Sequence, residues 1–402
     1  MNRKRLKEKI LFTGGGSGGH VSAATAIISG IRSQYEMNLD QILYIGSDLT
    51  MEGESDGKTK GKSHEEKILS TTDIPYRSIR AGKLQRYLSF RSFKLLFGIL
   101  GGFIDSWKVI SEFQPDRVVS TGGYVTVPIC IVAKIRGIPV YIHEQTAVVG
   151  LTNKIVGKFA KRIYISFISS ASFFPRERTL HTGNAVRPEI FNTTGEGPAQ
   201  QAIRKMLPNS KKYPIVLIAG GGQGSHLLNI TVRQMLTYLT EEFQVVLQTG
   251  DNQVHKDHEI LWKDRLKLPA DKQDRFFPVK FITAEEIGNV FSNTNIFVGR
   301  SGANFTYEMG VLQIPSILIP IPWVTHNEQM RNAQALEETG LARIIPEGEL
   351  TAERLFNELR RLSSIINKGT LKIDEEKLHT SFPINAVSTI INDLTLNSEP
   401  VL

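Results

Sequence analysis

Two glycine-rich turns, at residues 14–19 and 220–225, occur in the same context in the two halves of the chain. "GGGSGG" lies between the apolar run "ILFT" and the helical pattern "VSAATAIISGI", and "GGGQGS" lies between "YPIVLIA" and "HLLNITVRQMLTYL". An apolar strand, a bare turn and an amphipathic helix form the first half of a β-α-β unit. Because this unit occurs twice, the sequence predicts two doubly wound α/β domains, each with a parallel sheet covered by helices.

Two further segments repeat the order strand, small-residue turn, helix, strand. They are "DRVVSTGGYVTVPICIVAKIRGIPVYIHEQ" in the first half and "TNIFVGRSGANFTYEMGVLQIPSILIPIP" in the second. The turn-rich stretch that begins at His181 is typical of a crossing between domains. We therefore predict a first domain at 1–186, a second at 187–376, and a C-terminal helix at 377–402 that can pack on either, including back on the first.

The charge balance favours an anionic partner. The 402 residues include 48 Lys and Arg against 40 Asp and Glu, a net charge of +8, which is typical of proteins that meet a phosphorylated substrate, an anionic membrane or nucleic acid. The single cysteine, Cys130, excludes an internal disulfide and a multi-cysteine metal site. No segment has the ~18 apolar residues of a membrane span, and the basic first residues lead into a short strand, so we expect a cytoplasmic protein.

Either glycine turn can bind an anion, because backbone amides and the helix dipole attract negative charge there. Gly14, Gly16 and Gly19 also satisfy G-x-G-x-x-G, so an NAD-dependent dehydrogenase is one alternative. Neither turn carries the Lys-Ser/Thr of a P-loop, and no Asp-x-Asp for a carboxylate-held metal occurs. A tight turn without a ligand is the other alternative.

Two titratable residues next to such turns are candidates for chemistry. His20 begins the first helix, where it either satisfies local backbone groups or acts as a general base. Glu308 lies about one turn into the helix of "RSGANFTYE". A carboxylate there either accepts both hydroxyls of a ribose or belongs to a solvated helix face.

Two segments differ from the rest of the chain in composition. Residues 51–67 are polar and charged, which indicates a flexible surface insertion. The segment Arg77–Ile104 has six basic residues, no acidic one, and apolar residues between them. We interpret it as a surface for an anionic membrane, with a core helix that has a solvated basic face as the alternative. Its bases are Arg77, Arg80, Lys83, Arg86, Arg91 and Lys94.

Taken together, the motifs resemble those of the MurG family of glycosyltransferases. The blocks that carry the resemblance occur in the family's order and cover nearly the whole chain. They are "GGGSGGHV", "STGGYVTVP", "GIPVYIHEQ", "GLTNK", "TGNAVR", "GGGQGS", "RSGANFTYE" and "PIPWVTHNEQMRNAQAL". The "PWVTHNEQ" block looks closest to the Gram-positive branch.

The resemblance implies a GT-B architecture, in which two Rossmann-like domains face a cleft. It implies an inverting enzyme of peptidoglycan synthesis with no bound metal, no cofactor and no nucleic-acid partner. The donor would be UDP-GlcNAc, bound by the C-terminal half, and the acceptor would be lipid I, a lipid-linked diphosphate met by the N-terminal half. The enzyme would be peripheral, at the cytoplasmic face of the cell membrane.

The resemblance also implies roles for single residues. His20 would be the catalytic base near the reacting hydroxyl, and "GGGSGG" would cradle the acceptor diphosphate. The backbone of Ile282 would meet the uracil, and Gln329 would read the sugar hydroxyls. The remaining substrate-binding positions implied by the family are Ser17, Gly18, Gly19, Arg187, Ala303, Asn304, Phe305, Thr306, Tyr307 and Glu308.

Two positions depart from the family pattern. Thr146 stands where a sugar-contacting asparagine is usual, and Gly222 stands where a serine contacts the pyrophosphate. A hydroxyl has less reach and fewer donors than an amide, and losing the serine removes one hydrogen bond to phosphate. These changes keep one alternative open, a paralogue that uses another nucleotide sugar or a lipid acceptor such as diacylglycerol. A non-catalytic membrane-binding or UDP-binding scaffold is a separate alternative.

Overall fold

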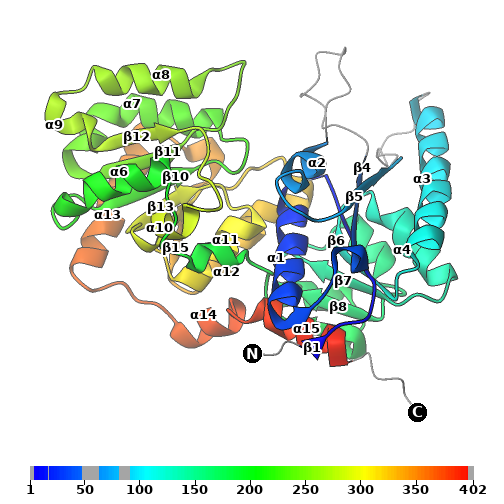
Figure 1. Cartoon of the computed structure of the whole chain (residues 1–402). Helices are drawn as coiled ribbons and strands as arrows, with labels where there is room; N and C mark the ends of the chain where they lie inside the picture. The colour runs from blue at the N-terminus through cyan, green and yellow to red at the C-terminus, as the bar shows by residue number, and fades with distance from the viewer. Residues whose placement is uncertain (1–3, 17, 48–62, 81–90, 397–402) are drawn as a thin grey trace. The chain divides into compact units, whose positions relative to one another are not determined.

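The computed structural model describes residues 4–16, 18–47, 63–80 and 91–396 (Figure 1). It divides into two compact units. One consists of Met1–Arg187 together with Pro383–Leu402, and the other is Pro188–Phe382. The second unit therefore extends past the predicted end at 376, because helix α14 (Glu375–Ser381) leads to Phe382, whose ring packs 5.1 Å from that of Tyr307.

The first unit is built on a seven-stranded sheet in which all neighbours pair in parallel. Its strand order is β5-β4-β2-β6-β7-β8-β9. The bounds, in that order, are Tyr76–Ile79, Ile42–Ser47, Ile10–Gly14, Arg117–Gly122, Val140–Glu144, Arg162–Ile165 and Thr179–His181. Outside this sheet, β1 (Lys4–Arg5) pairs in parallel with β3 (Tyr35–Glu36).

Helices cover both faces of this sheet because successive strand residues point to opposite sides. Ile10 and Phe12 of β2 share a core with α1 (Gly18–Gln34), α2 (His64–Leu69) and α15 (Ala386–Leu396). Leu11, between them, belongs to the core on the other face. There the covering helices are α3 (Arg91–Phe113), α4 (Thr126–Ile135) and α5 (Leu151–Val156).

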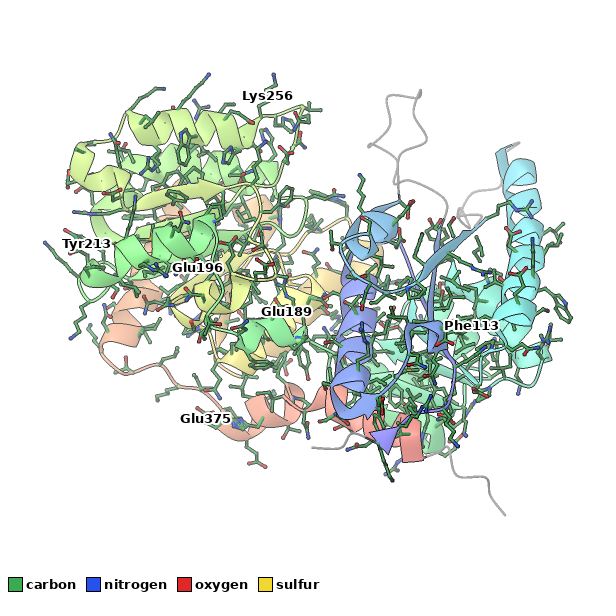
Figure 2. All side chains as sticks on the ribbon, in the orientation of Figure 1. Phe113, Glu189, Glu196, Tyr213, Lys256 and Glu375 are labelled. Atoms are coloured by element: carbon green, nitrogen blue, oxygen red, sulfur yellow. The ribbon has the colours of Figure 1, made fainter. Side chains whose placement is uncertain are left out.

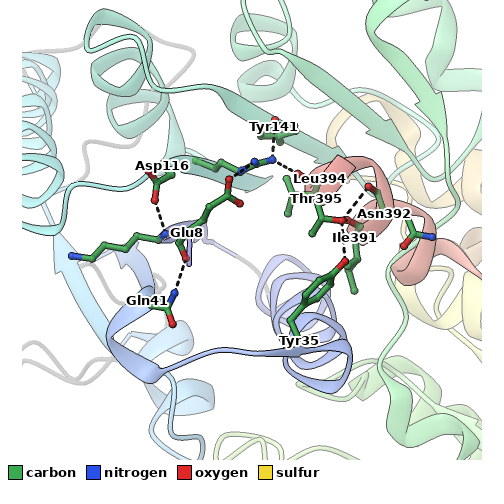
Figure 3. Close-up of polar contacts among 11 residues, drawn as sticks. Glu8, Tyr35, Gln41, Asp116, Tyr141, Ile391, Asn392, Leu394 and Thr395 are labelled. Atoms are coloured by element: carbon green, nitrogen blue, oxygen red, sulfur yellow. Dashed lines mark hydrogen bonds and ion pairs between the residues drawn. The ribbon is translucent and has the colours of Figure 1, made fainter. Parts of the chain in front are cut away.

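Helix α15 joins the first unit although it comes from the end of the chain (Figure 3). Ile390, Ile391 and Leu394 are buried in the core beside α1. The buried guanidinium of Arg117 donates to the Leu394 carbonyl, and it also meets Glu8 at 2.6 Å. Apolar burial and these polar contacts together fix the helix to the sheet.

The second unit contains a six-stranded parallel sheet with the order β12-β11-β10-β13-β14-β15. The strand bounds, in that order, are Phe276–Val279, Gln244–Gln248, Ile215–Ala219, Ile296–Gly299, Ser316–Leu318 and Ala342–Ile344. Its other helices are α6 (Pro198–Met206), α7 (His226–Glu242), α8 (Asp257–Leu266), α9 (Ala270–Gln273), α10 (Ile287–Ser292), α11 (Ala303–Leu312), α12 (Glu328–Glu337) and α13 (Ala352–Asn367). Side chains fill the layers between helices and sheet in both units (Figure 2).

The prediction of two doubly wound parallel sheets is confirmed. In each unit the strand order reverses once, between β2 and β6 in the first and between β10 and β13 in the second. The glycine turns follow β2 and β10 at their carboxyl ends, which is where open α/β sheets bind ligands. None of the described helices has the length and hydropathy needed to cross a membrane.

Candidate active site

The glycine turn after β2 is packed against its neighbours. The Tyr44 hydroxyl donates to the Gly14 carbonyl at 2.9 Å, the Gly15 amide donates to the Gly122 carbonyl at 3.1 Å, and the Gly16 amide donates to a Glu65 carboxylate oxygen at 2.5 Å. A diphosphate cradle is therefore limited to the amides that follow, at the start of α1. Gly18 and Gly19 lie there, and Ser17 lies outside the described residues.

Close packing explains why this turn consists of glycines. A Cβ on Gly14 would lie 2.2 Å from Thr121 Oγ1, and one on Gly15 would lie 2.6 Å from the Glu65 carboxylate. In the turn after β6, Gly123 has a left-handed φ of +93°, and a Cβ there would lie 1.9 Å from the Gly15 carbonyl oxygen. The turns after β2 and β6 therefore pack directly against each other where the strand order reverses, and larger residues would separate them.

His20 is half-buried in the first turn of α1, next to these two turns. Thr121 Oγ1 donates to the His20 carbonyl at 2.9 Å, and the side-chain amide nitrogen of Gln145 lies 3.4 Å from the ring Nδ1. Burial lowers the pKa of His20, whereas a hydrogen bond with the Thr121 backbone and the charge of Glu65 act in the opposite direction. The ring is neutral near pH 7 and able to accept a proton.

The segment after β7 is organised by a buried carboxylate, Glu144. It accepts hydrogen bonds from the Thr146 amide at 3.1 Å, the Thr146 hydroxyl at 2.8 Å, the Gly150 amide at 3.2 Å and Asn153 Nδ2 at 3.0 Å. Burial raises the pKa of Glu144, and these bonds counteract the rise. The Thr146 hydroxyl also lies 2.6 Å from the Val148 carbonyl, so its proton is used within the loop and only its lone pairs are left for a sugar.

In the second unit, one side chain that the sequence did not single out connects two predicted positions. Gln248, the last residue of β11, donates to the Gly221 carbonyl at 2.9 Å and accepts the Ile282 amide at 3.1 Å. The glycine turn and Ile282 therefore lie together. Gly222 has ordinary backbone angles, and a Cβ there would meet no atom within 4 Å, so it faces open space.

A buried arginine lies behind this turn. Arg300, directly after β13, is only 5% exposed and donates to Ser225 Oγ at 3.0 Å. It pairs with Glu347 at 2.5 Å and donates to the Ile319 carbonyl at 3.2 Å. Burial lowers the pKa of Arg300 while Glu347 raises it. The guanidinium fixes the end of the turn where α7 begins.

The predicted segment Ala303–Glu308 forms the first turns of α11. The Thr306 amide makes the first intrahelical bond, to Gly302 at 3.0 Å, so the amides before it are the helix N-terminus. Thr306, Tyr307 and Glu308 are buried, the last at 1% exposure, so the solvated-face alternative for Glu308 is wrong. The Phe305 ring stacks 5.3 Å from Phe297. Asn304 is half-buried on the same turn.

Gln329, on α12, lies next to the start of α11. Its side-chain oxygen accepts the Ile321 amide at 3.1 Å, and its carbonyl accepts the Ser301 hydroxyl at 2.8 Å. The structure therefore brings the turn at 220–225, Ile282 and Gln248 into one group, and Gln329 and Ala303–Glu308 into another, both at the carboxyl edge of the second sheet. Arg187 is half-buried and ends the first unit, whereas the sequence predicted it as the start of the second domain.

The predicted membrane segment is partly described. Leu100, Ile104 and Trp107 form an exposed apolar stripe on α3, beside exposed Ile135 of α4, and Arg136 lies 5.4 Å above the Trp107 ring. Two of the predicted bases are already paired: Arg77 with Glu112 at 2.6 Å and Arg80 with Asp105 at 2.7 Å. Lys83 and Arg86, and the side chains of Arg91 and Lys94, lie outside the described residues.

Comparison with known proteins identifies the family. Residues 10–165 match the model of the glycosyltransferase family 28 N-terminal domain, and residues 215–382 match that of the family 28 C-terminal domain. A UDP-N-acetylglucosamine--N-acetylmuramyl-(pentapeptide) pyrophosphoryl-undecaprenol N-acetylglucosamine transferase of Pediococcus pentosaceus is 36% identical over 88% of this chain and 90% of its own length. One of the same name, number 2, from Bacillus anthracis is 32% identical over 96% and 99%. The chain belongs to the MurG family of glycosyltransferases.

Solved structures agree on the fold. A crystal structure of Acinetobacter baumannii MurG superposes with a TM-score of 0.66 at 22% identity, covering 96% of this chain and 99% of that one. A glycosyltransferase of kitacinnamycin gives 0.67 at 14% identity, covering 98% and 99%. These structures show the GT-B fold, and membership of a glycosyltransferase family makes the dehydrogenase alternative wrong.

The structure also shows site residues that the sequence analysis missed. Thr121, Gln145 and Glu65 surround His20, and Gln248 and Arg300 support the second glycine turn. Arg300 and Gln145 lie inside motifs already singled out, so their position was a usable signal. In the part of the chain that the structure describes, no group of three or more His, Cys, Asp or Glu side chains is arranged to hold a metal ion.

Proposed function

We propose that this chain transfers N-acetylglucosamine from UDP-N-acetylglucosamine to N-acetylmuramyl-(pentapeptide) pyrophosphoryl-undecaprenol. The observation that carries the proposal is the identity of 32–36% with transferases of that name over both halves of the chain. In this chain the glycine turns follow β2 and β10 at their carboxyl ends, and His20 lies in the first turn of α1.

The second unit is the proposed donor side. The N-terminal amides of α11 and the turn at Gly222 are suited to the diphosphate, because peptide N–H groups and a helix dipole stabilise negative charge. The Ile282 amide is already bonded to Gln248, so its carbonyl remains for the uracil imide. Glu308 is the proposed partner of the ribose hydroxyls, and Gln329 that of the sugar, with its amide nitrogen as the donor.

The first unit is the proposed acceptor side, with His20 as general base. The acceptor hydroxyl attacks the anomeric carbon of the donor sugar and gives its proton to the imidazole. The bond from that carbon to the diphosphate oxygen breaks, and UDP leaves with the electron pair. A neutral imidazole whose pKa is lowered by burial has the protonation state that this step requires. Thr121 Oγ1 holds the backbone carbonyl of His20, and the Gln145 amide lies beside the ring.

The acceptor's lipid tail requires that the enzyme reach a membrane surface. The apolar stripe of Leu100, Ile104, Trp107 and Ile135 is the proposed contact, at the cytoplasmic face of an anionic bilayer. Since Arg77 and Arg80 are paired with acids, apolar insertion contributes more than these two charges.

The test is a transfer assay with purified protein, radiolabelled UDP-N-acetylglucosamine and the lipid-linked muramyl-pentapeptide acceptor in detergent. We expect labelled lipid product, and a loss of about 10²–10⁴-fold in kcat for His20→Ala. UDP-glucose as donor and diacylglycerol as acceptor serve as the alternatives. Transfer only with one of these would show a paralogue of different specificity.

A further inference from the structure

The carboxylate of Glu65 packs against the glycine turn after β2. Its side chain accepts the Gly16 amide at 2.5 Å, and its oxygen lies 2.6 Å from the position that a Cβ on Gly15 would occupy. Glu65 is 2% exposed, so this charge is not a solvated surface group. It is also the charged group that acts on the His20 ring and on the Tyr44 hydroxyl.

Helix α2, which carries Glu65, is fixed at both ends. Ser63 Oγ accepts the Glu66 amide at 3.2 Å and so caps α2, and it lies 3.2 Å from the Tyr76 hydroxyl of β5. Leu69, at the end of α2, is buried in the core with α1. The prediction of a flexible insertion at 51–67 is therefore wrong for 63–67, while 51–62 lie outside the described residues.

Several titratable groups surround His20. Glu65 lies on α2 and the buried His143 lies on β7, and both interact with the His20 ring. Tyr44 lies on β4, close to Glu65. His143 is neutral near pH 7, because burial lowers its pKa to about 4, and burial raises the pKa of Tyr44. Glu65 is the acidic side chain of this group, and its charge acts on both His20 and Tyr44.

We propose that Glu65 is a positioning residue for the transfer reaction: it holds the Gly14–Gly16 turn that carries His20, and its negative charge stabilises the imidazolium formed when His20 takes the acceptor proton. The proposal rests on the function proposed above. It also accounts for the Gly16 amide, which serves the fold here rather than the acceptor diphosphate.

The expected consequence has a definite sign. A nearby negative charge favours protonated histidine and raises its pKa. Glu65→Gln keeps an oxygen for the Gly16 amide and removes the charge, so the pKa of His20 should fall by about 0.5–1. The base would then be weaker, and kcat would be up to about tenfold lower. The low-pH limb of kcat would move to lower pH, and KM for the sugar donor would be unchanged within about twofold.

The test is an NMR titration of the His20 ring in the full chain without substrate, with the resonance assigned by its loss in His20→Gln. Glu66→Gln is the matched control, since it removes the same charge from the next residue of α2. We expect the pKa to fall in Glu65→Gln and not in Glu66→Gln. Equal values in wild type and Glu65→Gln would overturn the proposal.

The pH profile of kcat for the same variants gives a second readout. Because the titration needs no turnover, it judges the coupling between Glu65 and His20 even if the enzyme uses another donor or acceptor. Glu65→Ala, which also loses the bond to Gly16, should lower kcat further than Glu65→Gln. If Glu65→Ala and Glu65→Gln both kept the kcat of the wild type, the positioning role would be refuted.

Discussion

The carboxylate of Asp393 lies 3.1 Å from the guanidinium of Arg162, although 231 residues separate them in the sequence. The same carboxylate accepts the buried Tyr164 hydroxyl at 2.9 Å. One acidic residue near the end of the chain therefore closes two contacts with β8 of the first unit.

Replacing Asp393 should destabilise the first unit. In Asp393→Ala the Tyr164 hydroxyl stays buried without its acceptor and Arg162 loses its carboxylate partner, so we expect a loss of about 2 kcal/mol in free energy of unfolding. Urea unfolding followed by circular dichroism measures it. Asn392→Ala, an exposed neighbour on α15, is the control and should change stability by less than about 0.5 kcal/mol.

Gly222 can be returned to the family's serine without a steric penalty. Its Cβ position is open and its φ is ordinary, so Gly222→Ser should leave the melting temperature unchanged and add one hydrogen bond to the diphosphate. A gain of about 1 kcal/mol corresponds to roughly fivefold tighter UDP binding in calorimetry. Gly221→Ser is the contrasting variant: its φ of +95° penalises a side chain, so it should lower stability. Unchanged UDP affinity in Gly222→Ser would place the diphosphate elsewhere.

His143 should make the first unit sensitive to acid. Burial lowers its pKa from 6.5 to about 4, so the unfolded chain takes up a proton before the folded one as pH falls. The stability that depends on a neutral His143 is fully present above pH 6.5 and is lost as the pH falls from about 6.5 to 4. Linkage gives a loss of about 2 kcal/mol between pH 7 and 5, which His143→Gln should remove. Denaturant unfolding at the two pH values decides; an equal loss in both proteins would contradict it.

The apolar stripe on α3 should bind vesicles. Ile104 is 65% exposed, and Ile104→Asp places a charge where insertion is proposed. We expect at least about a fivefold loss of co-sedimentation with vesicles that contain anionic lipid, since burying this side chain contributes about 1.5 kcal/mol or more. Val254→Asp, at an 85% exposed position of the second unit, is the control. Equal loss in both variants would argue against a specific surface.

The doubly wound architecture could be predicted from sequence because each β-α-β unit has a local signature. The strands "ILFT" and "YPIVLIA" and the glycine turns after them were placed correctly, and His20 and Gln329 lie at the edge of the sheet where the motifs put them. The contacts that complete the site are not local. Glu65 reaches Gly16 across 49 residues, and Gln248 reaches Ile282 across 34.

The hydrogen-bond partners and the burial of single side chains also could not be predicted from the sequence pattern. The hydroxyl of Thr146 bonds Glu144 within its own loop, a contact that the sequence pattern did not indicate. Glu65 lay in a run of charged residues, and composition alone cannot distinguish a solvated carboxylate from a buried one. Such outcomes depend on which elements pack together, which a single sequence does not specify.

The return of α15 to the first sheet has a consequence for biogenesis. A ribosome makes β2 to β9 first, yet Ile390, Ile391 and Leu394, which seal the core beside α1, emerge last. The second unit, formed by the continuous stretch Pro188–Phe382, has all its residues available earlier. Translation therefore completes the second unit while the first unit still exposes the apolar face of α1 that α15 covers, so that a nascent chain stalled before α15 presents this face to chaperones.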